Sequence, residues 1–225
     1  MTKIDSKLAG GSRAELALYW VGRSLCVGFC RVWLRATVEG REHVPRHGAY
    51  ILAPVHRSNM DTPIVAICTR RRLRYMGKDS LWRTSAFGWL LSALGGFPVS
   101  RDIADREALE RCIDVLRGGE PLVLFPEGER KGGPIVQPLK DGAAYIALRA
   151  GVPIVPVGIG GSERVMPKGS KWIHPRKVHL VIGPPIVGEV GESGRITRSA
   201  RAAVSARLSS ELQRLFDAAQ VRAGA

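Results

Sequence analysis

The sequence predicts a single α/β domain with a mixed, largely parallel sheet flanked by helices, preceded by an N-terminal amphipathic helical segment. From about residue 40, short apolar runs alternate with longer amphipathic ones, which is the pattern of α/β domains. The chain has 225 residues, of which 45% are hydrophobic and 24% charged, as in one folded globular domain. No internal repeat or low-complexity linker divides it. We therefore expect a helical segment over 1–39 and the domain over 40–225.

The N-terminal segment reads as an amphipathic basic helix. Residues 14–37 are strongly apolar, but Arg23, Arg31 and Arg35 interrupt them, whereas a helix that spans a bilayer needs ~20 largely uncharged residues. On a helical wheel these arginines share one sector. Outside that sector lie the apolar side chains Leu18, Trp20, Val27, Phe29 and Trp33. Such a helix either lies in the headgroup layer of a membrane or packs on the core of the domain itself.

The remaining elements follow from periodicity and from turn residues. A helix over 139–150 is expected to end at Gly151, and the final helix has apolar residues every three to four positions. Apolar runs predict strands at 49–55, 97–99, 121–126, 152–159 and 177–186. Amphipathic runs predict helices at 62–69, 81–94 and 103–117.

Charge and cysteine content narrow the class of partner. The formal charge of +14 favours anionic partners, either a membrane surface or a phosphorylated substrate. Nucleic acid is not expected, because no recognition helix, finger or aromatic platform accompanies the charge. The four cysteines form no CxxC pair and have no histidine at zinc-ligand spacing, so neither a disulfide framework nor a metal site is indicated. The first residues lack a secretory signal, so we expect a reducing cytoplasm.

The strongest candidate for chemistry is a histidine with a nearby carboxylate. His56 directly follows the strand expected at 49–55, and Asp61 comes five residues later, at the start of a helix. A neutral imidazole can take a proton from an alcohol while an acidic partner holds the ring. Asp61 could instead cap the helix, although Thr62, followed by Pro63, competes for that role.

Four motifs occur in a fixed order: HRSNMD (56–61), GGFPVSR (95–101), LFPEGER (124–130) and VPIVPVGI (152–159). Together they resemble the phospholipid-synthesis glycerolipid acyltransferase family, over roughly residues 40–190. The resemblance implies that His56 is the general base and Asp61 its orienting partner. It also implies that Arg101, which ends the second motif, helps to hold the acceptor phosphate, for which a guanidinium is suited.

The third motif departs from the family pattern FPEGTRS. Glu127, Gly128 and Arg130 are retained, so the resemblance implies acceptor binding for them, with Glu127 orienting Arg130 or accepting a hydrogen bond from a glycerol hydroxyl. Glu129 and Lys131 replace a threonine and a small residue. These two changes bear on the acceptor head group and can offset one another electrically.

Further cations extend the expected binding surface. The resemblance places Lys78 and Lys140 where family members also tend to carry lysines, so both could meet phosphate, although a solvated surface position is the simpler explanation for each alone. The fourth motif is assigned to the core or to an acyl-chain channel. A dense basic run adds to the charge near the bilayer: Arg70, Arg71, Arg72 and Arg74.

The resemblance implies transfer of a fatty acyl group from acyl-CoA or an acyl carrier protein to the free hydroxyl of 1-acylglycerol-3-phosphate, giving phosphatidate, with no metal or redox cofactor. The expected location is the cytoplasmic face of the cell membrane, peripheral or monotopic. One alternative keeps the chemistry on another lysophospholipid, glycolipid or amino-acid lipid. Another is a non-catalytic lipid-binding or membrane-remodelling protein of the same fold.

Overall fold

The computed structural model describes residues 12–99, 106–167, 169–189 and 195–225. Its centre is a seven-stranded sheet in the order β1-β7-β6-β2-β5-β3-β4. Neighbouring strands are parallel except for the pair β6 and β7. The strands are β1 (Thr37–Glu39), β2 (Ile51–Pro54), β3 (Arg74–Lys78), β4 (Gly96–Val99), β5 (Leu122–Val123), β6 (Ile154–Gly160) and β7 (His179–Ile182). The predicted α/β class with a mixed, largely parallel sheet is confirmed.

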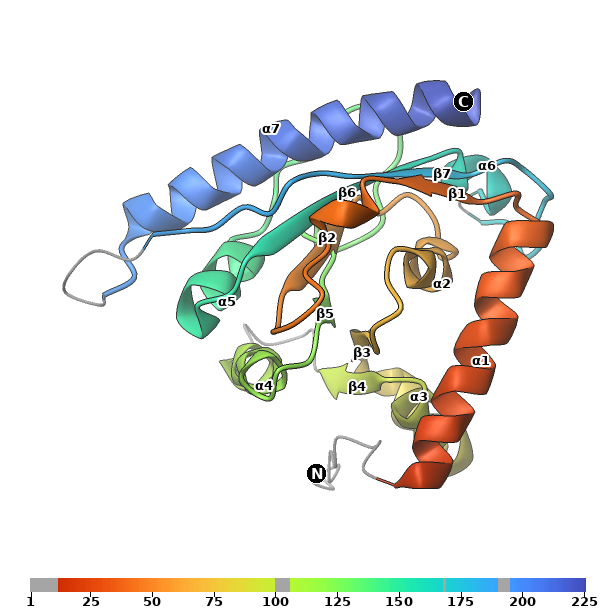
Figure 1. Cartoon of the computed structure of the whole chain (residues 1–225), viewed down its shortest axis with the longest axis horizontal. Coiled ribbons are helices and arrows are strands. Elements are labelled where there is room, and N and C mark those ends of the chain that lie inside the picture. The colour runs from red at the N-terminus through yellow and green to blue at the C-terminus, as the bar shows by residue number, and fades with distance from the viewer. Residues whose placement is uncertain (1–11, 100–105, 168, 190–194) are drawn as a thin grey trace.

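Helices surround this sheet (Figure 1). The α-helices are α1 (Arg13–Val32), α2 (Asp61–Ile64), α3 (Ser85–Ala93), α4 (Arg106–Arg117), α5 (Gly142–Ala150), α6 (Ser162–Val165) and α7 (Arg198–Ala223). The described residues also form three short 3₁₀ helices: η1 (Arg41–His43), η2 (Val65–Ile67) and η3 (Asp79–Trp82).

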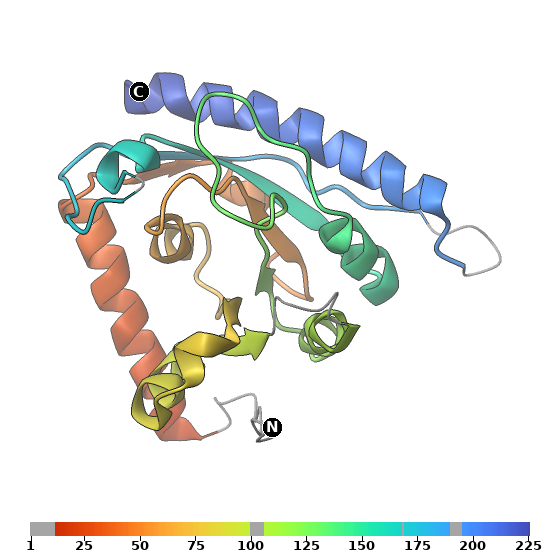
Figure 2. The same ribbon diagram turned by 180° about the vertical axis from the view of Figure 1, so that it is seen from behind.

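The centre of the sheet is buried because its strands are short and apolar throughout. All four residues of β2 and all seven of β6 are buried, as expected for parallel strands covered on both faces. Helix α7 crosses the sheet along β6 (Figure 2). Its buried side chains repeat at three to four residues, as the sequence predicted: Val204, Leu208, Leu212, Leu215, Phe216, Ala219 and Ala223.

The N-terminal helix α1 begins with a capping box, in which Glu15 N donates to Ser12 Oγ at 3.2 Å and Ser12 N to a Glu15 carboxylate oxygen at 3.3 Å. One side of α1 packs on the domain, where the backbone N–H of Leu73 donates to the hydroxyl of Tyr19 at 2.9 Å. The opposite side is exposed and apolar. The helix therefore packs on the core of the domain, as one of the two expected placements requires. It also presents a hydrophobic surface, which the other placement, in the headgroup layer of a membrane, requires.

Two strands were not predicted. β1 and β3 carry few large apolar residues, and β1 lies within the segment 1–39, so the sheet begins before residue 40. The other predicted elements are present with shifted bounds, and the helices expected at 62–69 and 81–94 are each divided into an α-helix and a 3₁₀ helix. Gly151 ends α5 with a φ of 66°. Within the described residues, no helix is both long and apolar enough to cross a membrane.

Candidate active site

The turn between β2 and α2 brings His56 and Asp61 together. His56 Nδ1 lies 3.1 Å from Asp61 Oδ2, and the Asp61 side chain has no exposed surface whereas that of His56 is 15% exposed. Nε2 of His56 meets no hydrogen-bond partner within the described residues. The histidine therefore has one ring nitrogen held by a buried carboxylate and the other available to a substrate.

Asp61 is fixed by the backbone of the same turn. Its Oδ2 atom accepts hydrogen bonds from the backbone N–H groups of Arg57 and Ser58, both at 2.6 Å. The helix begins at Asp61, and neither its N-cap Met60 nor Thr62 caps it through a side chain. The expectation that Thr62 would be the cap is thus wrong, because the helix begins two residues earlier than Thr62 as cap would require, with Met60 in the N-cap position. Asp61 Oδ1 has no partner in the described part of the chain.

The loop after β5 supports His56 from the other side. The ring of Phe125 stacks on the imidazole, with centroids 4.0 Å apart and planes at 24°. Glu127 accepts a hydrogen bond from the backbone N–H of His56 at 3.1 Å, and Lys131 N donates to the His56 carbonyl at 2.9 Å. Residues of the first and third motifs therefore form one structural unit.

Glu127 pairs with Arg57, a residue that the sequence analysis did not single out. Arg57 Nη1 lies 2.9 and 2.8 Å from the two carboxylate oxygens of Glu127, and both side chains are buried. Glu127 also accepts from the backbone N–H of Gln137 at 3.1 Å. The expected pairing of Glu127 with Arg130 is wrong in this structure, because the buried partner is Arg57 and Arg130 is exposed.

The Arg57 side chain is held along its whole length. It donates to the carbonyls of His56, Gly133 and Ile135 at 3.2–3.3 Å, and its guanidinium lies 4.8 Å from the ring centroid of Phe216. One feature of the sequence could have pointed to Arg57, namely its position next to the candidate base His56. A carboxylate in the third motif would need such a cation if it were buried.

The turn at Gly128 brings Lys140 to the third motif. Gly128 has a φ of 76°, and a Cβ atom built there would lie 2.6 Å from Lys140 Cδ and Cε and 3.0 Å from Nζ. The backbone N–H of Lys140 also donates to the carbonyl of Pro126 at 2.8 Å. The left-handed conformation at this position favours glycine, and the Lys140 side chain lies against the turn.

The two departures from the family pattern contact each other. Lys131 Nζ lies 2.6 Å from Glu129 Oε1, and the two side chains are 32% and 66% exposed. They lie beside Arg130, whose exposed side chain makes no hydrogen bond or ion pair with the described residues. The expected electrical offset therefore takes the form of a direct ion pair.

The structure does not place every predicted residue. Arg101 lies outside the described residues. Lys78 ends β3, which is two positions from β2 in the sheet, and its side chain is not described. No three His, Cys, Asp or Glu side chains gather as a metal site would require in the part of the chain that is described.

The sheet carries a His–Asp dyad at the end of a parallel strand, supported by a buried Arg–Glu pair, an arrangement suited to proton transfer by an imidazole. Comparison with known families agrees: residues 35–160, more than half of the chain, match the acyltransferase family. The chain belongs to this family.

Relatives named as acyltransferases support the same assignment. The chain is 31% identical over 168 residues to the 1-acyl-sn-glycerol-3-phosphate acyltransferase of Streptococcus pneumoniae, covering 74% of this chain and 60% of that one. It is 28% identical over 158 residues to the chloroplastic enzyme BAT2 of Brassica napus, covering 68% and 46%. The chain spans about half the length of this and another plant relative.

A solved structure has the same fold. The crystal structure of the 1-acyl-sn-glycerophosphate (LPA) acyltransferase PlsC from Thermotoga maritima superimposes with a TM-score of 0.68 at 26% identity. The match covers 89% of this chain and 79% of that one. The similarity therefore extends well beyond the region that matches the family.

Proposed function

We propose that this chain transfers a fatty acyl group from an acyl thioester to the free hydroxyl of 1-acylglycerol-3-phosphate, giving phosphatidate. The observation that carries the proposal is the dyad, in which a buried carboxylate holds Nδ1 of His56 and leaves Nε2 to the substrate. The choice of acceptor is supported by the relatives from Streptococcus pneumoniae and Brassica napus, both named as 1-acyl-sn-glycerol-3-phosphate acyltransferases.

In the proposed reaction His56 Nε2 takes the proton of the acceptor hydroxyl as its oxygen attacks the thioester carbonyl. Asp61 holds the tautomer that carries its proton on Nδ1 and stabilises the imidazolium that forms. The tetrahedral intermediate then collapses by expelling the thiolate, which recovers the proton from His56. No acyl-enzyme is required.

Acceptor binding is proposed for Arg130 and Lys140, with Arg101 and Lys78 as further cations implied by the family resemblance. The contacts of Lys140 with the Gly128 turn support its role, because they bring an ammonium group to the third motif. Glu127 is proposed to act through position, since its carboxylate is already satisfied by Arg57 and by backbone N–H groups.

A membrane location is proposed from the exposed apolar surface of α1 and α3. These helices contact each other and lie on the same side of the molecule (Figure 1). Contiguous exposed apolar side chains mark interaction surfaces, and tryptophans favour the bilayer interface. The exposed set comprises residues on or just after α1 (Trp20, Val21, Leu25, Phe29, Val32 and Trp33), Leu81 on η3, and residues on α3 (Phe87, Trp89 and Leu90).

Acyl transfer from palmitoyl-CoA, and in parallel from palmitoyl-acyl carrier protein, to lysophosphatidate tests the reaction. Thiol release is followed for the wild type, for His56→Ala and for the control His47→Ala, which removes an exposed histidine without a hydrogen bond in the described residues. Activity in the wild type and control but not in His56→Ala supports the proposal. Activity only with another lysolipid changes the acceptor, and no activity with any acceptor or donor favours a non-catalytic lipid-binding protein.

A further inference from the structure

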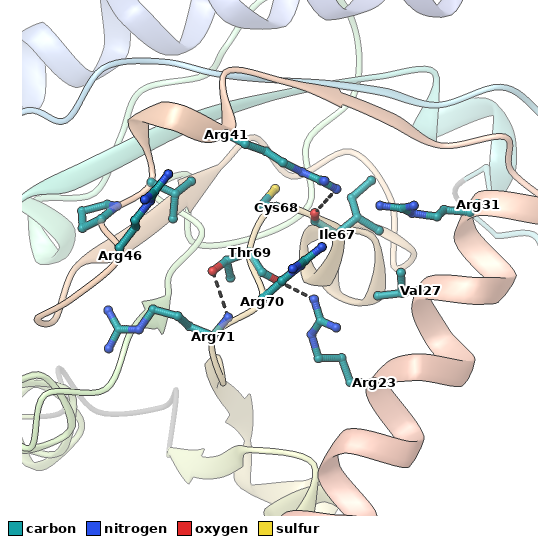
Figure 3. A pocket seen from close by; sticks show the side chains of 12 residues that line it. Arg23, Val27, Arg31, Arg41, Arg46, Ile67, Cys68, Thr69, Arg70 and Arg71 are labelled. Atoms are coloured by element: carbon teal, nitrogen blue, oxygen red, sulfur yellow. Dashed lines mark hydrogen bonds between the residues drawn. The ribbon is translucent and has the colours of Figure 1, made fainter.

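A second concentration of cations lies away from the dyad. A pocket of about 670 Å³ opens between α1, η1 and the chain that follows η2 (Figure 3). Among the described residues, no Asp or Glu lines it. The six arginines that line it are Arg23, Arg31, Arg41, Arg46, Arg70 and Arg71.

Two of these arginines have a structural explanation. Arg23 Nη2 donates to the carbonyls of Ala66, at 3.0 Å, and Thr69. Arg41 Nη2 donates to the carbonyl of Ile67 at 2.7 Å. These carbonyls end the helical segment α2–η2, where the partial negative charge of a helix C-terminus favours cations. Each guanidinium has five donors, so both retain N–H groups for another partner.

The other cations lack such an explanation. Arg31 and Arg70 make no hydrogen bond or ion pair with the described residues. In Figure 3 their guanidinium groups extend toward those of Arg23 and Arg41, while Arg46 and Arg71 extend to the other flank. Burial lowers the pKa of Arg41, and repulsion from Arg31 and Arg70 lowers it further. Within the part of the chain that is described, no carboxylate among the residues lining the pocket neutralises this positive charge.

The pocket is separate from the proposed reaction site. Asp61 begins α2, and Ile67, Cys68 and Thr69 line the pocket at the end of η2. Arg71 donates to the carbonyls of Gly48 and Gly119, which precede β2 and β5, whereas His56 follows β2. The pocket and the dyad therefore lie at opposite ends of the parallel strands.

We propose that this pocket binds a phosphate group, with Arg31 and Arg70 as its free ligands and Arg23 and Arg41 completing the cluster. Guanidinium groups bind phosphate oxygens through paired donors. The phosphate belongs either to the headgroup of an anionic phospholipid or to a soluble phosphorylated compound. Arg23 and Arg31 are on the helix that exposes Trp20 and Phe29, which places the pocket beside the surface proposed to meet the bilayer.

The test replaces the two arginines that make no bonds within the protein, as Arg31→Gln with Arg70→Gln. The control pair, Arg149→Gln with Arg207→Gln, removes the same charge from exposed positions on α5 and α7. One arm measures sedimentation with phosphatidylcholine vesicles, with and without phosphatidylglycerol. The other measures thermal unfolding with pyrophosphate.

In the lipid arm, we expect the pocket pair to weaken binding to phosphatidylglycerol vesicles about tenfold or more, and the control pair about twofold, because basic groups contribute most when held at the anionic surface. In the soluble arm, pyrophosphate at about ten times its Kd raises the wild-type Tm by about 3–6 °C, and the pocket pair loses this shift.

A selective loss in the first arm identifies a lipid headgroup, and one confined to the second identifies a soluble phosphate. Equal effects of both pairs, or none in either arm, would overturn the proposal. Because neither arm measures acyl transfer, this outcome is independent of the proposed reaction.

Discussion

Arg57 Nη1 lies within 2.9 Å of both carboxylate oxygens of Glu127, and neither side chain is exposed to solvent beyond 1%. This pair joins the loop that carries His56 to the loop that follows β5. Because Glu127 also binds the backbone N–H of His56, the pair fixes the position of the proposed base. Its energetic value therefore bears on both stability and catalysis.

Replacing Glu127 by Gln should destabilise the protein by about 3–5 kcal/mol, because the Arg57 charge stays buried without its counter-ion. Urea unfolding measures this change. The double variant Arg57→Met with Glu127→Leu removes both charges and should recover part of the loss. For the active fraction of Glu127→Gln we expect kcat to fall while KM for lysophosphatidate stays near wild type. An increase in that KM alone, at unchanged stability, would instead indicate direct acceptor binding by Glu127.

Asp61→Asn tests the orienting carboxylate. Asp61 Oδ2 accepts hydrogen bonds from His56 and from two backbone N–H groups. In asparagine the amide oxygen is a weaker acceptor than a carboxylate oxygen, and the NH₂ group cannot accept the proton of His56 Nδ1. We expect kcat to fall about 10²–10⁴-fold, the range associated with a positioned acid or base. The control is Asp141→Asn, an exposed aspartate at the start of α5 without a side-chain capping bond. Equal activity of the two variants would contradict the role of Asp61.

The exposed pair of Glu129 and Lys131 is expected to tune acceptor affinity with little effect on stability. Glu129→Gln removes negative charge beside Arg130, so KM for lysophosphatidate should fall roughly three- to fivefold, as for one unit charge several ångströms away in a watery medium. Lys131→Gln should have the opposite effect. Unfolding free energies should change by less than about 1 kcal/mol. Steady-state kinetics with lysophosphatidate and with an uncharged lysolipid show whether the change in KM depends on the charge of the acceptor. Equal changes in KM for both acceptors would argue against a role of this pair in phosphate affinity.

The close packing of α7 on β6 depends on a glycine. A Cβ atom at Gly158 would lie 2.2 Å from the carbonyl oxygen of Leu215, a backbone atom that cannot turn aside. Gly158→Ala should therefore cost about 3 kcal/mol of unfolding free energy, as overpacking does. Gly28, on α1, has no atom within 4 Å of its added Cβ, so Gly28→Ala should stabilise the chain by about 0.5–1 kcal/mol. Urea unfolding of both variants checks the contrast, and similar changes would refute the packing argument.

Periodicity predicted the elements whose burial is simple. The seven buried residues of β6 and the apolar face of α7 each repeat a single pattern, so their type followed from the sequence. β1 has two exposed residues around one half-buried valine, and β3 begins and ends with cations, so neither resembles a buried strand. Their places depend on pairing with β7 and with β4 and β5, which no local pattern encodes.

The candidate site divides in the same way. His56 and Asp61 are five residues apart in one turn, so their contact could be predicted from local sequence. The pairing of Arg57 with Glu127 joins residues separated by 70 positions, and it arises because β2 and β5 are neighbours in the sheet. The basic run at Arg70 and Arg71 was visible as charge, but only the fold brings Arg31 and Arg41 to it.

His179 makes the joint between β1 and β7 sensitive to pH. Its Nδ1 lies 2.7 Å from Thr37 Oγ1, and burial lowers its pKa below the ordinary 6.5, with Arg222 and Lys177 lowering it further and Glu39 raising it. The unfolded chain therefore takes up this proton at a higher pH than the folded chain does. The contribution of His179 to the free energy of unfolding is therefore fully present above about pH 6.5. It is lost as the pH falls from there through the pKa of the folded chain.

We therefore expect the wild type to lose more unfolding free energy between pH 7.5 and pH 5.0 than His179→Asn, which has no titrating ring. Asparagine can still bond to Thr37, so the variant should stay folded at pH 7.5. His47→Asn removes an exposed histidine and should follow the wild type across the whole range. Urea unfolding at the two pH values for all three proteins decides the matter. If His179→Asn loses as much stability as the wild type, burial of the neutral imidazole is not the source of the acid sensitivity, and the carboxylates of the fold must account for it.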